Sequence, residues 1–193
     1  MPNTDMIQRG IEAREQVNTE IVPALVKAFG SKVSLIAATG DQIPQVWAPA
    51  DALVEVVQWL RSCGFNMLVD LTAVDYYPNR EPRFEMVYHF RQLPALGVIR
   101  VRVRCGEKAE VPTLSHLWSM ADPAEREVFD QFGIRFKGHP NLKRILNPDD
   151  WEGHPLRRDY PTRGPRALIS LEMPADENRY YDFPGEESSK DGK

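Results

Sequence analysis

Two copies of the tripeptide Gly-His-Pro, at residues 138–140 and 153–155, are the first candidates for chemistry. Nearby carboxylates come from Asp149, Asp150, Glu152 and Asp159. Imidazole and carboxylate groups are metal ligands, so a metal site is one interpretation. The two histidines lack the His-x-x-x-His type of spacing that places both rings together. We therefore favour tight turns, in which each imidazole bonds to a backbone carbonyl or to a neighbouring subunit.

The sequence offers no other catalytic or cofactor-binding pattern. Cys63 and Cys105 are the only cysteines, too few for a four-cysteine zinc site or a cluster ligated only by thiolates. There is no Gly-x-Gly-x-x-Gly fingerprint, no phosphate-binding loop and no Gly-x-Ser-x-Gly elbow. We expect two buried thiols, no catalytic set, and no NAD, flavin, iron–sulfur cluster or metal held by this polypeptide.

A row of three arginines gives the clearest period of two in the chain. Arg100, Arg102 and Arg104 alternate with apolar residues, which predicts a strand with one polar face. That face is either solvated or meets a partner. Nucleic-acid binding is the second functional class that such a row suggests. The formal net charge of −4 and the lack of an aromatic RNA-binding motif count against it.

Charge is distributed unevenly along the chain. Residues 1–134 carry 13 Lys and Arg against 17 Asp and Glu, residues 135–170 carry 8 against 4, and residues 171–193 carry 3 against 7. A basic band therefore separates two acidic parts. No apolar run reaches about 18 residues and the N-terminal residues do not resemble a signal peptide, so we expect a cytoplasmic protein.

Hydrophobic periodicity predicts helices and strands as far as residue 134. We expect helices over residues 5–29, where Pro23 marks either a kink or the first turn of a second helix, over 51–63, and over 122–132, where Asp122 to Glu125 form a capping-box pattern. Strands are expected over residues 32–39, 43–48, 66–76, 84–90 and 99–104, with 66–76 apolar enough for a central strand. The order indicates an α+β fold, in which helices pack on a mixed or mainly antiparallel sheet.

From Ile134 onward the periodicity disappears, although large apolar and aromatic residues persist. Frequent Gly and Pro interrupt any longer element, and long irregular segments in compact proteins usually serve a function. We expect a globular domain over residues 1–134 and a long extended partner-binding arm over 135–185, ordered only against its partner. A loose tail is expected over residues 186–193.

The segments around the two Gly-His-Pro motifs carry a family resemblance. Glu125 to Pro140, Leu142 to Leu146 and Asp149 to Pro161 resemble the signature of the C subunit, or 30-kilodalton subunit, of respiratory complex I, the NADH:quinone oxidoreductase. Three earlier segments are similar to that family in the same order: residues 68–76, 83–89 and 111–118. The resemblance covers about residues 20–165. Pro123 and Gln131 depart from the family pattern, which usually has an aromatic and an apolar residue there.

The resemblance implies a non-catalytic structural subunit of the complex's peripheral arm, on the cytoplasmic side of the bacterial inner membrane. Such a complex passes electrons from NADH through FMN and iron–sulfur centres to quinone while pumping protons. Those cofactors belong to other subunits, and the D, B and I subunits are the implied partners. A subunit of a related membrane-bound hydrogenase or ferredoxin-linked complex remains an alternative.

The predicted interface residues come from the last helix and the arm. We expect ion pairs and helix-end contacts with partners from Glu125, Arg126, Glu127 and Asp130. The arm would be anchored on its partner by His139, Arg144, His154, Arg157, Arg158 and Asp159.

Overall fold

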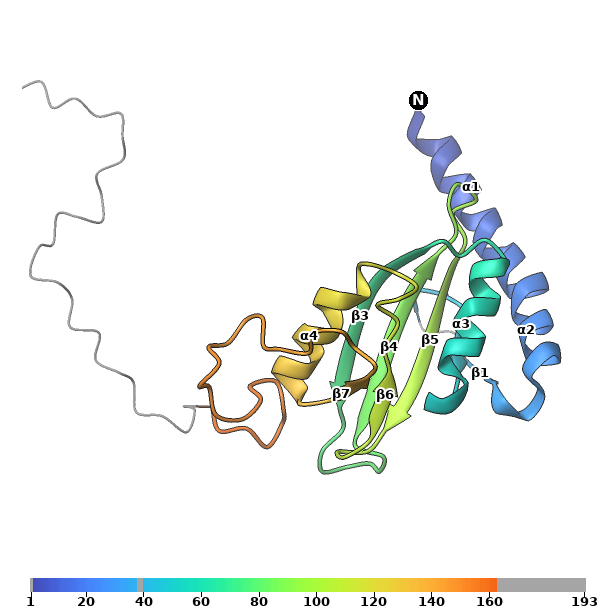
Figure 1. The fold of residues 1–193 in the computed structure, drawn as a ribbon. Helices are drawn as coiled ribbons and strands as arrows, with labels where there is room; N and C mark the ends of the chain where they lie inside the picture. The colour runs from blue at the N-terminus through green and yellow to red at the C-terminus, as the bar shows by residue number, and fades with distance from the viewer. Residues whose placement is uncertain (1, 38–39, 163–193) are drawn as a thin grey trace, which may run out of the picture. The chain divides into compact units, whose positions relative to one another are not determined.

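The computed structural model describes residues 2–37 and 40–162 (Figure 1). Met1–Thr162 form one compact unit. The part of the predicted arm from residue 163 to 185, and the predicted tail over 186–193, lie outside the described residues. Among the residues described, no helix is both long and apolar enough to cross a membrane.

A five-stranded sheet forms the centre of the unit, with strand order β1-β2-β5-β4-β3. The strands are β1 (Ser34–Ile36), β2 (Gln45–Trp47), β3 (Met67–Asp75), β4 (Phe84–Arg91) and β5 (Val98–Cys105). Within this sheet β2 and β5 pair in parallel, whereas β1–β2, β5–β4 and β4–β3 are antiparallel. The mainly antiparallel α+β fold predicted from the sequence is therefore confirmed.

The prediction that residues 66–76 form a central strand is wrong. Strand β3 lies at the edge of the sheet and pairs with β4 alone. It is apolar for another reason, because α4 (Ala121–Phe132) packs beside it and covers its inner face (Figure 1). The helix explains the apolar residues of this inner face only, because Met67, Val69 and Val74 on the outer face remain exposed.

Pro23 marks the first turn of a second helix, which is one of the two predicted possibilities. Helix α1 (Pro2–Gln16) and α2 (Val22–Phe29) are joined by a π-helical turn, η1 (Val17–Ile21), and η2 (Gly30–Lys32) follows as a 3₁₀ turn. Pro23 lies in the first turn of α2, where its missing N–H removes no helical hydrogen bond. The distortion is therefore placed before the proline, in the turn whose hydrogen bonds the proline ring would disturb.

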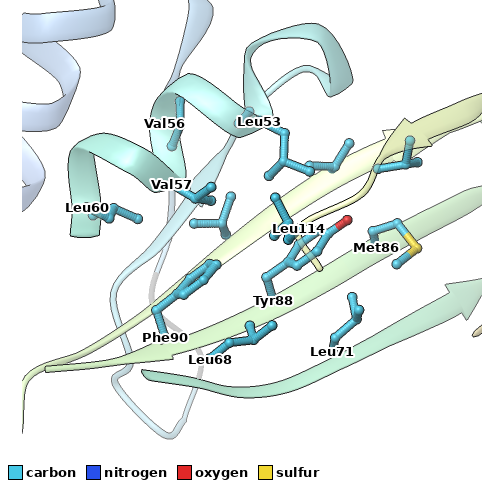
Figure 2. Packing of buried hydrophobic residues seen from close by; sticks show 14 of the residues in the cluster. Leu53, Val56, Val57, Leu60, Leu68, Leu71, Met86, Tyr88, Phe90 and Leu114 are labelled. Carbon is cyan, nitrogen blue, oxygen red and sulfur yellow. The ribbon is translucent and has the colours of Figure 1, made fainter. Parts of the chain in front are cut away.

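The core forms where α3 lies across the sheet (Figure 2). After the 3₁₀ turn η3 (Ala50–Ala52), α3 (Leu53–Ser62) buries Leu53, Val56, Val57 and Leu60 completely, at the helical spacing that predicted them. They meet the inward face of β4, whose buried side chains are Phe84, Met86, Tyr88 and Phe90. Burial of each such side chain contributes roughly 1.5–3 kcal/mol.

The compact unit continues past the domain boundary expected at residue 134. Strand β7 (Arg135–Lys137) pairs in parallel with β6 (Glu110–Pro112), which forms a second, two-stranded sheet. Residues 138–162 then return to α4 and β3 through backbone and side-chain hydrogen bonds described below. Local periodicity gave no sign of this, because the contacts join segments far apart in the chain.

Gly133 connects α4 to this returning segment. Its φ of +76° is a left-handed conformation, and an added Cβ would lie 2.5 Å from Arg157 Nη2 and from His154 Nε2. Replacement by alanine would therefore strain the backbone and displace both side chains.

We expect Gly133→Ala to lower the free energy of unfolding by about 3 kcal/mol in a urea titration of the full chain. Gly106→Ala is the matched control, because Gly106 has open space around its Cα and needs no positive φ. It should change stability by less than about 0.5 kcal/mol. Equal stability of the two variants would show that the close approach at Gly133 does not exist in solution.

Candidate partner-docking site

The carboxylate of Asp130, in the last turn of α4, holds the segment that follows β7. Its Oδ2 accepts three consecutive backbone N–H groups, from Ile145 (3.2 Å), Leu146 (2.9 Å) and Asn147 (2.8 Å). Its Oδ1 accepts the Arg144 guanidinium at 2.6 Å and the Asn147 side-chain amide at 3.0 Å. We call residues 141–160 the docking loop. One buried carboxylate thus fixes the backbone of its central turn.

The pKa of Asp130 shows that this carboxylate is held as an anion. Burial alone would raise its pKa, but the N–H groups of Asn147, the Arg144 guanidinium and the Leu146 N–H outweigh burial and bring the pKa well below its usual range. Asp130 has no exposed surface. A buried charge without these donors would be strongly unfavourable, so the loop and the carboxylate stabilise each other.

Arg144 extends the network across the loop. While its Nη1 bonds to Asp130, its Nη2 donates to the carbonyls of Trp151 (2.9 Å) and Gly153 (3.0 Å). Arg126, one turn earlier in α4, donates to the carbonyls of Lys143 and Arg144 at 3.1 Å each. Irregular backbone with no secondary structure of its own therefore has its carbonyls satisfied by two guanidinium groups.

The second half of the docking loop caps the C-terminus of α4. Carbonyls in the last turn of a helix lack intrahelical partners, and cations there also favour the helix dipole. The bonds that satisfy them are His154 Nδ1 to Asp130 (2.9 Å), the Leu156 N–H to Gln131 (3.1 Å) and Arg157 Nε to Phe132 (2.6 Å). Because a carbonyl only accepts, His154 carries its proton on Nδ1.

The end of the docking loop is clamped to the sheet by an arginine between two aspartates. Arg83 donates to both carboxylate oxygens of Asp75, at 2.7 and 3.0 Å, and of Asp159, at 2.6 and 3.0 Å. The Arg158 N–H donates to the same Asp75 at 2.9 Å. Paired, two-point contacts of this kind fix orientation as well as distance.

Two members of this clamp, Arg83 and Asp75, are buried, whereas Asp159 is partly exposed. Burial alone would raise the pKa of Asp75, but hydrogen bonds from Arg83, Arg158 and Tyr77 lower it to about 2. Hydrogen bonds from Arg83 also lower the pKa of Asp159, against the opposing effect of burial. Both carboxylates stay ionised at neutral pH, so the clamp persists in physiological conditions.

Glu125 turns inward instead of capping α4. The helix begins at Ala121 with no side-chain capping bond, so the predicted capping box is wrong. The Glu125 carboxylate accepts the Leu114 N–H at 2.6 Å and the Thr113 hydroxyl at 2.5 Å. It is fully buried, and burial raises its pKa from 4.5 to about 7, against the lowering effect of those two bonds.

Each Gly-His-Pro motif sets a turn, as the sequence-based interpretation proposed. His139 Nε2 donates to the Asp122 carbonyl (3.2 Å), while its Nδ1 accepts the Asn141 N–H (3.0 Å). His154 donates from its other ring nitrogen, Nδ1, to the Asp130 carbonyl. No group of three or more potential metal ligands occurs among residues 2–37 and 40–162.

The structure sorts the predicted interface residues into clusters within the chain. Asp130, Arg144, His154 and Arg157 meet at the C-terminal end of α4, with Arg126 beside them, whereas Glu125 and His139 lie nearer its start. Arg158 and Asp159 meet Asp75 and Arg83, two residues that the sequence analysis missed. Glu127 belongs to none of these three groups, and its side chain is exposed. Contact of any of these residues with another subunit stays a prediction.

Three large apolar side chains of the docking loop are exposed, among charged and polar neighbours. Ile145, Leu146 and Leu156 are 41%, 64% and 54% exposed. Their own N–H groups donate to Asp130 or Gln131 of α4, so their backbone is fixed while their side chains are exposed. Apolar groups held in this way on a polar frame are typical of a protein–protein contact.

Buried Glu125 should make stability depend on pH in a distinctive direction. Its folded-state pKa lies above its unfolded value, so its stabilising contribution is present below about pH 4.5 and is lost as the pH rises through about 7. We expect the wild-type chain to lose roughly 3 kcal/mol of stability between pH 5 and 8 through this group.

Denaturant titrations of Glu125→Gln at both pH values measure this effect, with Glu127→Gln as the control at an exposed neighbouring position. The first variant should lack most of the pH dependence and the second should retain it. If the wild-type chain and both variants show the same change of stability with pH, Glu125 ionises normally.

Comparisons with known proteins agree with this arrangement. Residues 46–166 match the family described as "Respiratory-chain NADH dehydrogenase, 30 Kd subunit". The chain is similar to the C subunit of NADH-quinone oxidoreductase from Moorella thermoacetica, at 50% identity over 63% of this chain and 82% of the relative. It is also similar to the corresponding C subunit from Geobacter metallireducens, at 38% identity over 80% and 89%.

Two solved structures share the fold. A trypsin-resistant fragment of Nqo5 (residues 1–134) is 32% identical, with a TM-score of 0.57, over 63% of this chain and 98% of that one. A chain of the archaeal membrane-bound sulfane sulfur reductase superposes with a TM-score of 0.64 over 75% and 86%. Its identity is 24%, so that likeness shows the fold alone.

Proposed function

Because the chain belongs to the 30-kilodalton subunit family of respiratory-chain NADH dehydrogenase and is a subunit of NADH-quinone oxidoreductase, we propose that its own role there is structural. It holds neighbouring subunits together through the docking loop and carries out no step of the redox reaction itself. The observation that supports this most is the loop's construction, with exposed Ile145, Leu146 and Leu156 on a backbone fixed by Asp130 and Arg144.

Preorganisation is the physical advantage of such a loop. An arm that becomes ordered only on binding loses conformational entropy at that moment, and its affinity falls accordingly. Here the hydrogen bonds to α4 fix the backbone before any partner arrives. Burial of the three apolar side chains then contributes to association without the additional cost of ordering the loop backbone.

The chemistry of the complex is assigned to its other subunits in this proposal. Two cysteines cannot ligate an iron–sulfur cluster with thiolates alone, and the thiol of Cys105 is buried, with a pKa raised by burial to about 12. FMN and the iron–sulfur centres would therefore reside in partner subunits. NADH:quinone oxidoreductase activity is then a property of the assembly.

The proposed neighbours are the D, B and I subunits of the peripheral arm, on the cytoplasmic side of the inner membrane. The docking loop carries four Lys and Arg against four Asp and Glu, so the proposed contact with these subunits depends on its exposed apolar side chains. Membrane association would be indirect, through the assembled complex.

The alternatives raised by the sequence have less support. The relatives from Moorella thermoacetica and Geobacter metallireducens, at 50% and 38% identity, are both named for NADH-quinone oxidoreductase and neither for a hydrogenase. Nucleic-acid binding is disfavoured because two arginines of the basic row already have internal carboxylate partners: Arg100 pairs with Asp41 and Arg102 with Glu85.

Leu146→Asp should separate docking from folding. Leu146 is 64% exposed, so the change should leave the stability of the isolated chain within about 0.5 kcal/mol of wild type. In the host, we expect the tagged variant to recover the other subunits at least about ten-fold less well, because a desolvated charge would face an apolar partner surface.

Leu35→Asp is the matched control, since Leu35 is 59% exposed on β1, a different element. Quantitative mass spectrometry of gently solubilised membranes measures both variants. Full recovery of the complex with Leu146→Asp would remove the docking loop from the interface, even if the chain still belongs to the assembly.

A further inference from the structure

The outer face of the sheet carries the arginine row, opposite the face on which α3 packs. In the register of β4 and β5, Tyr88 lies opposite Val101, and Glu85 and His89 lie opposite Arg104 and Arg100. Figure 2 shows Tyr88 on the core side of the sheet, beneath α3. The three arginines therefore share one surface with the outward side chains of β2.

Two arginines of the row are neutralised within the chain and one is not. Arg100 donates to the Asp41 carboxylate and Arg102 to that of Glu85, at 2.7 and 2.8 Å. Arg104 forms no ion pair with any of residues 2–37 and 40–162; its guanidinium instead lies 4.1 Å from the centre of the Trp47 ring. The row therefore ends in an oriented cation with its hydrogen-bonding edge available.

Arg104 borders a hollow of about 360 Å³ at the end of β2. The apolar lining of the hollow includes Trp47 and also Pro49 and Ala50, which lie just before α3. Lys32 supplies a second cation, and no aspartate or glutamate is among the described residues that line the hollow. Its shape and charge therefore fit a group that is anionic at one end and aliphatic at the other.

Lys32 is only weakly engaged within the chain. Its Nζ lies 4.0 Å from Glu55, and both side chains are largely exposed, 62% and 64%. Exposed pairs at this distance contribute little, so the lysine can turn toward another carboxylate at small cost.

We propose that this hollow binds a glutamate or aspartate side chain from an acidic segment of a neighbouring subunit. The carboxylate lies between Arg104 and Lys32, and the aliphatic stem covers Pro49 and Ala50. Stacking on Trp47 holds Arg104 in place beforehand, so a two-point contact with the carboxylate costs less side-chain entropy. The proposal rests on the chain working inside an assembly of several subunits, but not on the docking loop.

Carbodiimide cross-linking of the purified complex tests the proposal, because the reagent joins an amine only to a carboxylate that is already in contact with that amine. Peptide mass spectrometry should find Lys32 linked to an Asp or Glu of another subunit. The internal Lys32–Glu55 link shows in the same sample that the lysine reacts. Recovery of Lys32 linked to Glu55 alone would overturn the proposal.

Arg104→Gln removes the cation and keeps a side chain of similar length. In complex containing this variant, the intersubunit link at Lys32 should fall about five-fold relative to the Lys32–Glu55 link, because the carboxylate loses its charge-assisted hydrogen bonds. Arg91→Gln, at an exposed arginine at the end of β4, should leave the ratio unchanged. An unchanged ratio with Arg104→Gln would also overturn the proposal.

Links from Lys143 separate this test from that of the docking loop, on which Lys143 is exposed. If the complex gives intersubunit links at Lys32 but none at Lys143, the result would contradict the proposed contact of the docking loop and support the proposed site in the hollow. The reverse result would contradict the hollow and leave the docking loop in place.

Discussion

A single buried carboxylate decides whether the segment after β7 belongs to the folded domain. Asp130 lies on a helix that the sheet already fixes, and it can stay ionised only while the turn at residues 145–147 and Arg144 supply its donors. An unpaired buried charge costs several kcal/mol, so release of the loop would destabilise α4 as well. The polar network therefore makes the docking loop and the helix fold together.

Helix α4 binds two other segments of the chain, one near each of its ends. Its first half turns Glu125 inward to hold the segment that leads from β6, and its last turn holds the docking loop through Asp130 and the carbonyls that His154 and Arg157 cap. Arg83, between Asp75 and Asp159, then fastens the end of the loop to the sheet. The apolar groups of the docking loop are consequently presented by a frame fixed at both ends, which suits a protein whose proposed role is to join other subunits.

Hydrophobic periodicity predicted the elements that depend on local burial: the buried face of α3, the alternation along β4 and β5, and the mainly antiparallel sheet. It misplaced β3 in the sheet, because the apolar residues Met67, Val69 and Val74 indicate a buried strand but are exposed on an edge strand. It also missed the contacts of the docking loop, since Arg83 and Asp159 are 76 residues apart and leave no periodic trace. Sequence reasoning selected Asp130, Arg144 and His154 as interface residues, whereas the structure shows that they first bind one another.

The most direct test of a preformed docking loop is hydrogen–deuterium exchange of the isolated full-length chain. The three amides that donate to Asp130, those of residues 145–147, should exchange roughly a hundred-fold more slowly than unstructured peptide, although no partner is present. Amides of α3 provide the internal standard for the folded core. Exchange of residues 145–147 at the unstructured rate, with α3 still protected, would show instead that the loop becomes ordered only on its partner.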